Sequence, residues 1–384
     1  MASPIVPNEG VLLGRARVPG FEHPRVVTVR GEEVIDITSK LAPTSRDVAE
    51  LDDPAGYVAA AKGDPIGSLH LVLANSWSGK TDAGLPSLLS PIDLQAVKAA
   101  GVTFVVSLLE RVIEEQARGD KARADTLRQD ILGLIGTDLS QLVPGSETAM
   151  KVKETLISRG VWSQYLEVGI GPDAEIFTKC QPMSSVGFGA DVGILPISQW
   201  NNPEPEVAMV VTSKGTIIGA TLGNDVNLRD VEGRSALLLG KAKDNNASAS
   251  LGPFIRLFDG AFTIETVKAA DIALSVTGED GFELSGLSSM SQISRSPESL
   301  VDATVGRHHQ YPDGFVLYLG TMFAPVKDRE GPGKGFTHRV GDVVSISTPS
   351  LGTLSNTVRL STEAAPWSYG TSHLFRDLAK AGLL

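Results

Sequence analysis

The sequence predicts an α+β protein with a β-rich C-terminal domain and a smaller N-terminal domain of mixed helices and strands. The chain has 384 residues, which is long for a single average core. Its hydrophobic share of 42% and charged share of 21% are those of an ordinary globular protein. The periodicity of apolar residues changes near residue 165. We therefore predict an N-terminal domain over 1–164 and a C-terminal domain over 165–384.

The N-terminal part contains short strand-like runs followed by helical patterns. Clusters of Pro, Gly and Asp separate two predicted strands, at 26–30 and 69–74. Apolar positions at i, i+3 and i+4 spacing then predict helices over 93–119, with a break near Gly101, over 121–134 and over 147–157. Ser146 follows a Pro-Gly turn and is a suitable cap for the last helix.

The C-terminal part alternates Val- and Ile-rich runs with Gly-rich turns, a pattern typical of strands. The predicted strands lie at 207–211, 216–222, 314–321 and 342–347. The Ser-rich stretch at 285–299 is predicted to be a loop. All the candidate functional residues lie in this part of the chain.

Charge and cysteine content restrict the partners and the compartment. A net charge of −11 argues against nucleic acid and against anionic membrane surfaces as partners. The sequence contains no apolar run as long as the roughly 18 residues that a membrane-spanning helix needs. The single cysteine, Cys180, allows no intrachain disulfide, and the N-terminal residues do not resemble a secretion signal. We expect a cytoplasmic protein, which can still bind a small anion where a metal or a lysine reverses the local field.

The stretch from Asn201 to Val211 carries the most informative motif. Glu204 and Glu206 are two residues apart, so an extended chain directs both carboxylates to one face. Two neighbouring carboxylates repel each other unless a proton or a cation lies between them. Pro203 and Pro205 favour the entry or the edge of a strand. A solvated Pro-Glu loop is the alternative interpretation.

A third carboxylate follows the next predicted strand. Asp225 comes after the run at 216–222, and across a hairpin it would join Glu204 and Glu206. Three hard oxygen ligands suit Mg²⁺ or Mn²⁺ and leave coordination positions for water and substrate. Arg229 could instead pair with Asp230 or Glu232 as part of the scaffold.

Several ordered motifs together resemble the fumarylacetoacetate hydrolase superfamily. They are PEPEVAMVV, GATLGNDVNLRD, AKDNNASASLGPF, YLGT (318–321), LGTLSNTV (351–358) and the C-terminal run WSYGTSHLFRDLAKAGLL. The resemblance covers 165–384 well and 90–120 loosely. It implies a mixed β-roll fold, Glu204, Glu206 and Asp225 as the metal ligands, and a homo-oligomer, either a dimer or a tetramer.

Within this superfamily the chain is similar to the branch of sugar-acid dehydratases. The spacing between the second glutamate and the aspartate is short (225 − 206 = 19), and Glu175-Ile-Phe-Thr-Lys179 also matches that branch. The branch implies a small anionic 2-oxo acid as substrate and loss of water as the reaction. Lys243 is preferred to Lys241 because it stands nine residues before Gly252. The roles implied are catalysis by Glu175 and Lys243 and substrate binding by Ser198, Arg229 and Thr321.

Two other classes of function remain open at this point. A hydrolase that cleaves the C–C bond of an acylpyruvate would need a water-activating base, and Glu110, Glu114 and Glu115 lie in the helical region. A sugar-binding module without catalysis would rely on aromatic platforms, and aromatic residues make up only 5% of the chain. The products formed from a 2-oxo acid distinguish these classes.

Overall fold

The computed structural model describes residues 4–104, 108, 142–158, 160, 163–323, 325, 327–331 and 335–384. Within these ranges eleven strands form one large mixed sheet. Its order is β4 (Asp64–Ser68), β3 (Glu33–Asp36), β2 (Arg25–Arg30), β1 (Leu12–Arg17), β13 (Ala249–Leu257), β11 (Ile217–Asp225), β10 (Pro205–Val211), β16 (Phe315–Tyr318), β6 (Ala96–Gly101) and β7 (Glu175–Cys180), with β5 (Ser87–Leu88) beside β1. Most neighbours are antiparallel, but β16 and β6 are parallel.

A second sheet packs against the large one and closes the main core. It is formed, in order, by β15 (Glu283–Ser289), β14 (Asp271–Thr277), β17 (Val343–Thr348), β18 (Gly352–Leu360) and β8 (Asp191–Ile194). Along β14 and β17 buried and less buried residues alternate, as expected of strands with one face in the core. A two-stranded ribbon, β9 (Asn201–Asn202) with β12 (Asn227–Leu228), stands apart from both sheets.

Strand β10 lies at the centre of the large sheet, and its sequence explains why. All seven of its residues are buried. Met209 and its alternate neighbours belong to the core shared with the second sheet, whereas Ala208 and Val210 belong to a core on the opposite face. A continuous apolar run is what a strand buried on both faces requires. This strand carries the two glutamates at its entry.

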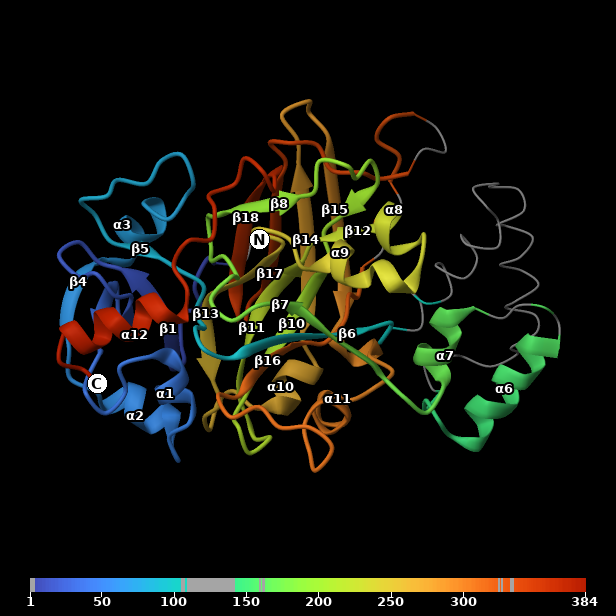
Figure 1. Cartoon of the computed structure of the whole chain (residues 1–384), viewed down its shortest axis with the longest axis horizontal. Coiled ribbons are helices and arrows are strands. Elements are labelled where there is room, and N and C mark those ends of the chain that lie inside the picture. The colour runs from blue at the N-terminus through green and yellow to red at the C-terminus, as the bar shows by residue number, and fades with distance from the viewer. Residues whose placement is uncertain are drawn as a thin grey trace.

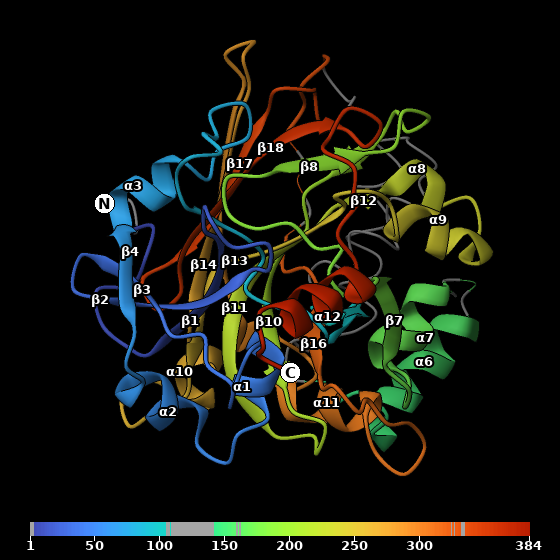
Figure 2. The same cartoon turned by 60° about the vertical axis from the view of Figure 1, so that its left-hand side comes forward.

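The helices lie around these sheets. They are α1 (Ser45–Ala49), α2 (Pro54–Ala60), α3 (Leu69–Ala74), α6 (Glu147–Ser158), α7 (Gln164–Ile170), α8 (Arg229–Glu232), η2 (Ala236–Leu238), α9 (Leu239–Lys243), α10 (Ile264–Lys268), η3 (Met290–Gln292), α11 (Pro297–Thr304) and α12 (Thr371–Lys380). Figure 1 shows α6 and α7 at one end of the molecule and α12 at the other end, among the N-terminal elements. Figure 2 shows α1, α2 and the strands β1 to β4 gathered at that same end.

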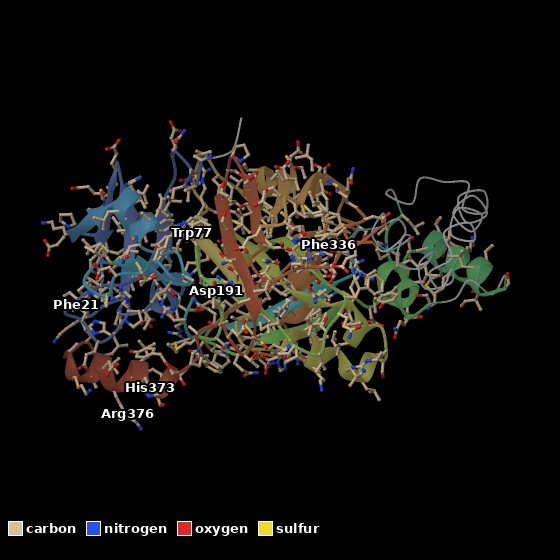
Figure 3. All side chains as sticks on the ribbon, turned by 90° about the horizontal axis from the view of Figure 1, so that it is seen from above. Phe21, Trp77, Asp191, Phe336, His373 and Arg376 are labelled. Carbon is tan, nitrogen blue, oxygen red and sulfur yellow. The ribbon has the colours of Figure 1, made fainter. Side chains whose placement is uncertain are left out.

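The C-terminal helix α12 therefore joins the N-terminal part of the chain. Lys380 forms an ion pair with Glu22 at 3.1 Å, and Leu374 and Leu378 are buried. Figure 3 labels His373 and Arg376 on α12 at the same end as Phe21. Strands from both sides of residue 164 also share the large sheet, because β1 pairs with β13 and β6 lies between β16 and β7. The boundary between 1–164 and 165–384 stays a prediction.

Most of the predicted elements are confirmed. The strands at 26–30, 207–211, 216–222, 314–321 and 342–347 correspond to β2, β10, β11, β16 and β17, and the helix at 147–157 corresponds to α6. The Ser146 hydroxyl accepts a hydrogen bond from Ala149 N at 3.2 Å, as predicted for its cap. The sheets are mixed, as the predicted β-roll requires. No helix in the described ranges is both long and apolar enough to cross a membrane.

Three predictions of secondary structure are wrong. The run at 69–74 is helix α3, because the Ser68 hydroxyl caps it by accepting from Leu71 N at 3.3 Å. The start of the helix predicted over 93–119 is strand β6, held between two partner strands. The Ser-rich stretch at 285–299 contains the end of β15, η3 and the start of α11. Much of 93–119 and all of 121–134 lie outside the described residues.

Candidate metal centre and active site

The hairpin of β10 and β11 brings the three predicted carboxylates together. Pro205 pairs with Asn224, so Glu204 and Asp225 lie opposite each other, and Asp225 N donates to Glu204 O at 3.0 Å. One ligand oxygen of each of Glu204, Glu206 and Asp225 lies within 4.8 Å of the others. The three residues are 3%, 1% and 1% exposed, which excludes a solvated loop. Pro205 stands at the entry of a central strand, not at a sheet edge.

Crowding of buried carboxylates shifts the protonation of Glu206. Burial, and after it the nearby charges of Asp225 and Glu204, raises the pKa of the Glu206 carboxyl well above its ordinary value of 4.5. Such a group holds a proton unless a cation replaces it. The cluster therefore has the electrostatic character of a cation site.

Lys243 provides one positive charge in the cluster. Helix α9 places its Nζ 2.6 Å from Glu204 Oε2 and 3.0 Å from Asp225 Oδ2. Burial alone would lower the pKa of Lys243, but the carboxylates of Asp225 and Glu204 outweigh it and raise that pKa. Lys241 on the same helix is exposed. Of the two candidate lysines, the structure brings only Lys243 to the carboxylates.

A second lysine, Lys179, also belongs to the cluster and was not predicted as a site residue. Its side chain is 0% exposed and its Nζ lies 2.9 Å from Asp225 Oδ1. The same Nζ donates to Lys243 O at 2.5 Å. Alternation along β7 could not have indicated it, because the register against β6 shifts between Thr178 and Cys180 and leaves Lys179 as the extra residue of a bulge.

Backbone and amide donors hold the carboxylates in place. Asn227 Nδ2 donates to Glu204 Oε1 at 3.0 Å, and Gly320 N donates to Glu206 Oε2 at 2.7 Å. Gly320 has φ +95°, and a Cβ there would lie 2.1 Å from Thr103 Oγ1, so glycine is required. Oriented carboxylates of this kind are what a metal site needs around its ligands.

The donor set fits a hard divalent cation. Three carboxylates and two lysines give the cluster a formal charge of −1 when all five groups are ionised. A divalent ion would reverse that sign and share the carboxylate charge, and all the ligand atoms offered are oxygens. The chemistry of these residues therefore matches Mg²⁺.

Glu175 lies at the start of β7, on the strand face that carries Phe177. Its carboxylate occupies the space above Gly101, where an added Cβ would lie 1.9 Å from Glu175 Oε2. Gly101 is the residue paired with Glu175 across the sheet. Between Glu175 and Lys179 the Phe177 ring lies 5.4 Å from Lys243 Nζ. Glu175 therefore lies on the same strand face as Phe177, whose ring contacts Lys243.

The three predicted substrate-binding residues lie on segments next to those that carry the cluster. The Ser198 hydroxyl donates to Asp230 Oδ1 at 2.7 Å. Arg229 begins α8 directly after β12, with its guanidinium 5.4 Å from the Trp200 ring. Thr321 follows Gly320 and its hydroxyl donates to Phe323 O at 3.1 Å. Ser198 and Arg229 thus lie at the β9–β12 side, and Thr321 at the Glu206 side.

The chain is similar to a known protein family and to two dehydratases. Residues 171–359 match the model of the fumarylacetoacetate (FAA) hydrolase C-terminal family. A probable 2-keto-3-deoxyxylonate dehydratase of Haloferax volcanii is 31% identical over 268 residues, which are 70% of this chain and 73% of that protein. A 2-dehydro-3-deoxy-D-arabinonate dehydratase of Saccharolobus solfataricus is 32% identical over 185 residues, which are 48% of this chain and 58% of that protein.

A solved structure shares the fold over almost its whole length. It is a 2-keto-3-deoxy-D-arabinonate dehydratase complexed with magnesium and 2,5-dioxopentanoate, with a TM-score of 0.62 and 21% identity. The likeness covers 91% of this chain and 99% of that one, and at this identity it establishes the fold alone. On the sequence matches and the shared fold, the chain belongs to the fumarylacetoacetate hydrolase family.

Proposed function

We propose that this protein is a Mg²⁺-dependent dehydratase that converts 2-keto-3-deoxy-D-xylonate, which is the same compound as 2-keto-3-deoxy-D-arabinonate, to 2,5-dioxopentanoate. The observation that carries the proposal is the buried set of Glu204, Glu206 and Asp225 with two lysines against it. The names of the two sequence relatives support the choice of substrate class.

In this proposal Glu204, Glu206 and Asp225 hold the cation. A bound Mg²⁺ would polarise the C2 carbonyl of the 2-oxo acid and make the C3 hydrogens more acidic. We assign binding of the substrate carboxylate to Thr321, next to Gly320, and contacts with the rest of the substrate to Ser198 and Arg229. Their positions on two sides of the carboxylate cluster support these assignments.

Glu175 acts in this proposal as the general base at C3. It takes one C3 proton, the remaining electron pair forms the C3–C4 double bond, and the C4–O bond breaks. The C4 hydroxyl leaves as water after it takes up a proton. Lys243 supplies positive charge, and help with that proton, on the side of the departing oxygen. The product of this step is 5-hydroxy-2-oxopent-3-enoate. Movement of one proton from C5 to C3 converts it to the C4–C5 enol, and movement of the C5 hydroxyl proton to C4 then gives the 2,5-dioxo acid.

Analysis of products from a panel of 2-oxo acids tests this function. The purified protein with Mg²⁺ should form a semialdehyde from the D-configured 2-keto-3-deoxy pentonate, whereas a C–C hydrolase would release pyruvate from an acylpyruvate. EDTA should abolish turnover, and Mg²⁺ or Mn²⁺ should restore it. Turnover by a verified metal-free sample would contradict the metal assignment. The C4 epimer in the same panel measures stereochemical preference.

The alternative catalytic bases, the oligomeric state and the cellular location stay predictions. Glu110, Glu114 and Glu115, the candidate bases of a hydrolase, lie outside the described residues. A dimer or tetramer is expected from the family alone, and sedimentation at micromolar concentration tests it. A monomer mass would contradict that expectation. A cytoplasmic location is likewise a prediction from the sequence.

A further inference from the structure

Two buried asparagines extend the carboxylate cluster beyond Glu204. Asn227 contacts the cluster directly, because its Nδ2 donates to Glu204 Oε1 at 3.0 Å. Asn202 lies opposite Asn227 in the antiparallel ribbon of β9 and β12. Side chains directly opposite each other in such a pair have Cβ atoms about 4.5–5.5 Å apart. The two amides are therefore neighbours at one side of the metal ligands.

Hydrogen bonds fix which end of each amide is oxygen. Asn227 Nδ2 faces a carboxylate oxygen, and Asn202 Nδ2 donates to Pro203 O at 2.9 Å. Carboxylates and carbonyls only accept hydrogen bonds, so the nitrogen must stand at these positions in both residues. The opposite atom of each amide is consequently an acceptor, Oδ1.

Both acceptor oxygens are buried, and in the part of the chain that the structure describes neither receives a hydrogen bond. Asn202 and Asn227 are each 1% exposed. Buried polar atoms nearly always have a partner, and an unsatisfied one is costly. Two such acceptors on a pair of opposite residues next to the carboxylate cluster therefore indicate a ligand that brings a donor.

The charges around the amides restrict that donor. Lys179 and Lys243 already lie in the cluster, and a bound divalent cation would make its formal charge +1. A cationic ligand would then be repelled, whereas a neutral O–H group fits two amide oxygens. A hydroxyl that leaves during the reaction is a poor partner, since it needs a proton donor and an amide oxygen can only accept.

We propose that Asn202 and Asn227 form a subsite that accepts a hydrogen bond from the terminal C5 hydroxyl of the substrate. This inference rests on the proposed function, because it supposes that the carboxylate and C2 carbonyl of a 2-oxo acid lie at the cation. The subsite would favour hydroxylated acids over acids of equal length without the hydroxyl. It determines specificity and does not take part in proton removal at C3.

Binding of two unreactive acids tests the subsite without catalysis. 5-Hydroxy-2-oxopentanoate keeps the terminal hydroxyl but has no C4 hydroxyl to lose, and 2-oxopentanoate has neither. Their Kd values are measured by calorimetry on the Mg²⁺-loaded protein. The wild type should bind the hydroxylated acid about tenfold more tightly, the usual effect of one hydrogen bond to a buried group.

Variants at Asn202 and at a buried asparagine elsewhere in the protein separate the subsite from a general effect of burial. In Asn202→Leu the preference should fall to about onefold. Asn202→Gln keeps an amide donor for Pro203 O and an acceptor oxygen, so it should retain the preference even if Leu disturbs folding. Asn356→Leu is the matched control. Asn356 is equally buried, but it lies on β18 of the second sheet, where its Nδ2 donates to Gly187 O at 3.0 Å and to Ala190 O at 2.9 Å.

The outcomes distinguish this inference from the proposed function. A wild type that dehydrates the 2-keto-3-deoxy pentonate while Asn202→Leu keeps the tenfold preference would overturn the subsite alone. Equal weakening of both acids together with weaker Mg²⁺ binding would also overturn it, since the donor would then be metal-bound water. A wild type that dehydrates no 2-keto-3-deoxy acid contradicts the proposed function, whichever acid it binds.

Discussion

Replacement of Lys179 by methionine tests the charge balance of the metal centre directly. Lys179 is completely buried and its Nζ lies 2.9 Å from Asp225 Oδ1. The change removes one partner of a buried ion pair and leaves three carboxylates facing one lysine, so the formal charge of the cluster falls from −1 to −2. Loss of one partner of a buried pair costs about 3–5 kcal/mol. We expect that loss of stability in the metal-free protein.

Mg²⁺ should recover a large part of this loss, because the cation supplies the positive charge that the variant lacks. The assay is denaturation of wild type and Lys179→Met, once in EDTA and once in saturating Mg²⁺. Lys98→Met is the matched control, since Lys98 lies on the neighbouring strand and donates to Thr178 Oγ1 at 2.9 Å, away from the carboxylates. The Mg²⁺-induced gain in stability should be larger in Lys179→Met than in the wild type and the control.

Two results would refute this reasoning. An EDTA-treated Lys179→Met protein that melts within about 1 °C of the control would show that the buried pair contributes little. A Mg²⁺ gain equal to that of the wild type would show that Lys179 and the cation do not share the same carboxylate charge. Loss of folding in EDTA with recovery in Mg²⁺ would be the expected result in its strongest form.

Three further predictions concern the reaction and its pH dependence. Glu175→Gln should bind metal and substrate but lower kcat by a factor on the order of 10²–10⁴, and it should not exchange C3 hydrogens with D₂O; exchange at the wild-type rate would place the base elsewhere. Lys243→Met should lower kcat and retain some exchange, while Lys241→Met, on the exposed side of α9, should behave as wild type in both assays. Because the folded-state pKa of Glu206 is raised above its ordinary 4.5, the folded metal-free protein binds more protons than the unfolded chain, and its stability should decline as pH rises from that value. Glu206→Gln should flatten that decline in a series of melting curves in EDTA, and an unchanged slope would contradict the assignment.

Local patterns in the sequence were sufficient to predict the site where residue spacing alone decides to which face of a strand a side chain points. Alternation places Glu204 and Glu206 on one strand face, and a hairpin places Asp225 opposite. The continuous apolar run of β10 matches a strand buried on both faces. Where a short apolar run suits helix and strand equally, as at 69–74 and 96–101, the sequence led to the wrong element.

The sequence by itself determined the family, the carboxylate motif and the choice of Lys243, because each depends on ordered motifs and fixed spacings along the chain. Only the tertiary structure decided that Lys179 belongs to the metal centre. It alone also placed Asn202 beside Asn227, and Gly320 against Glu206. These residues come from segments far apart in sequence. Their contacts depend on the order of strands in the sheet and on strand register, and the spacing of residues within one segment does not determine either.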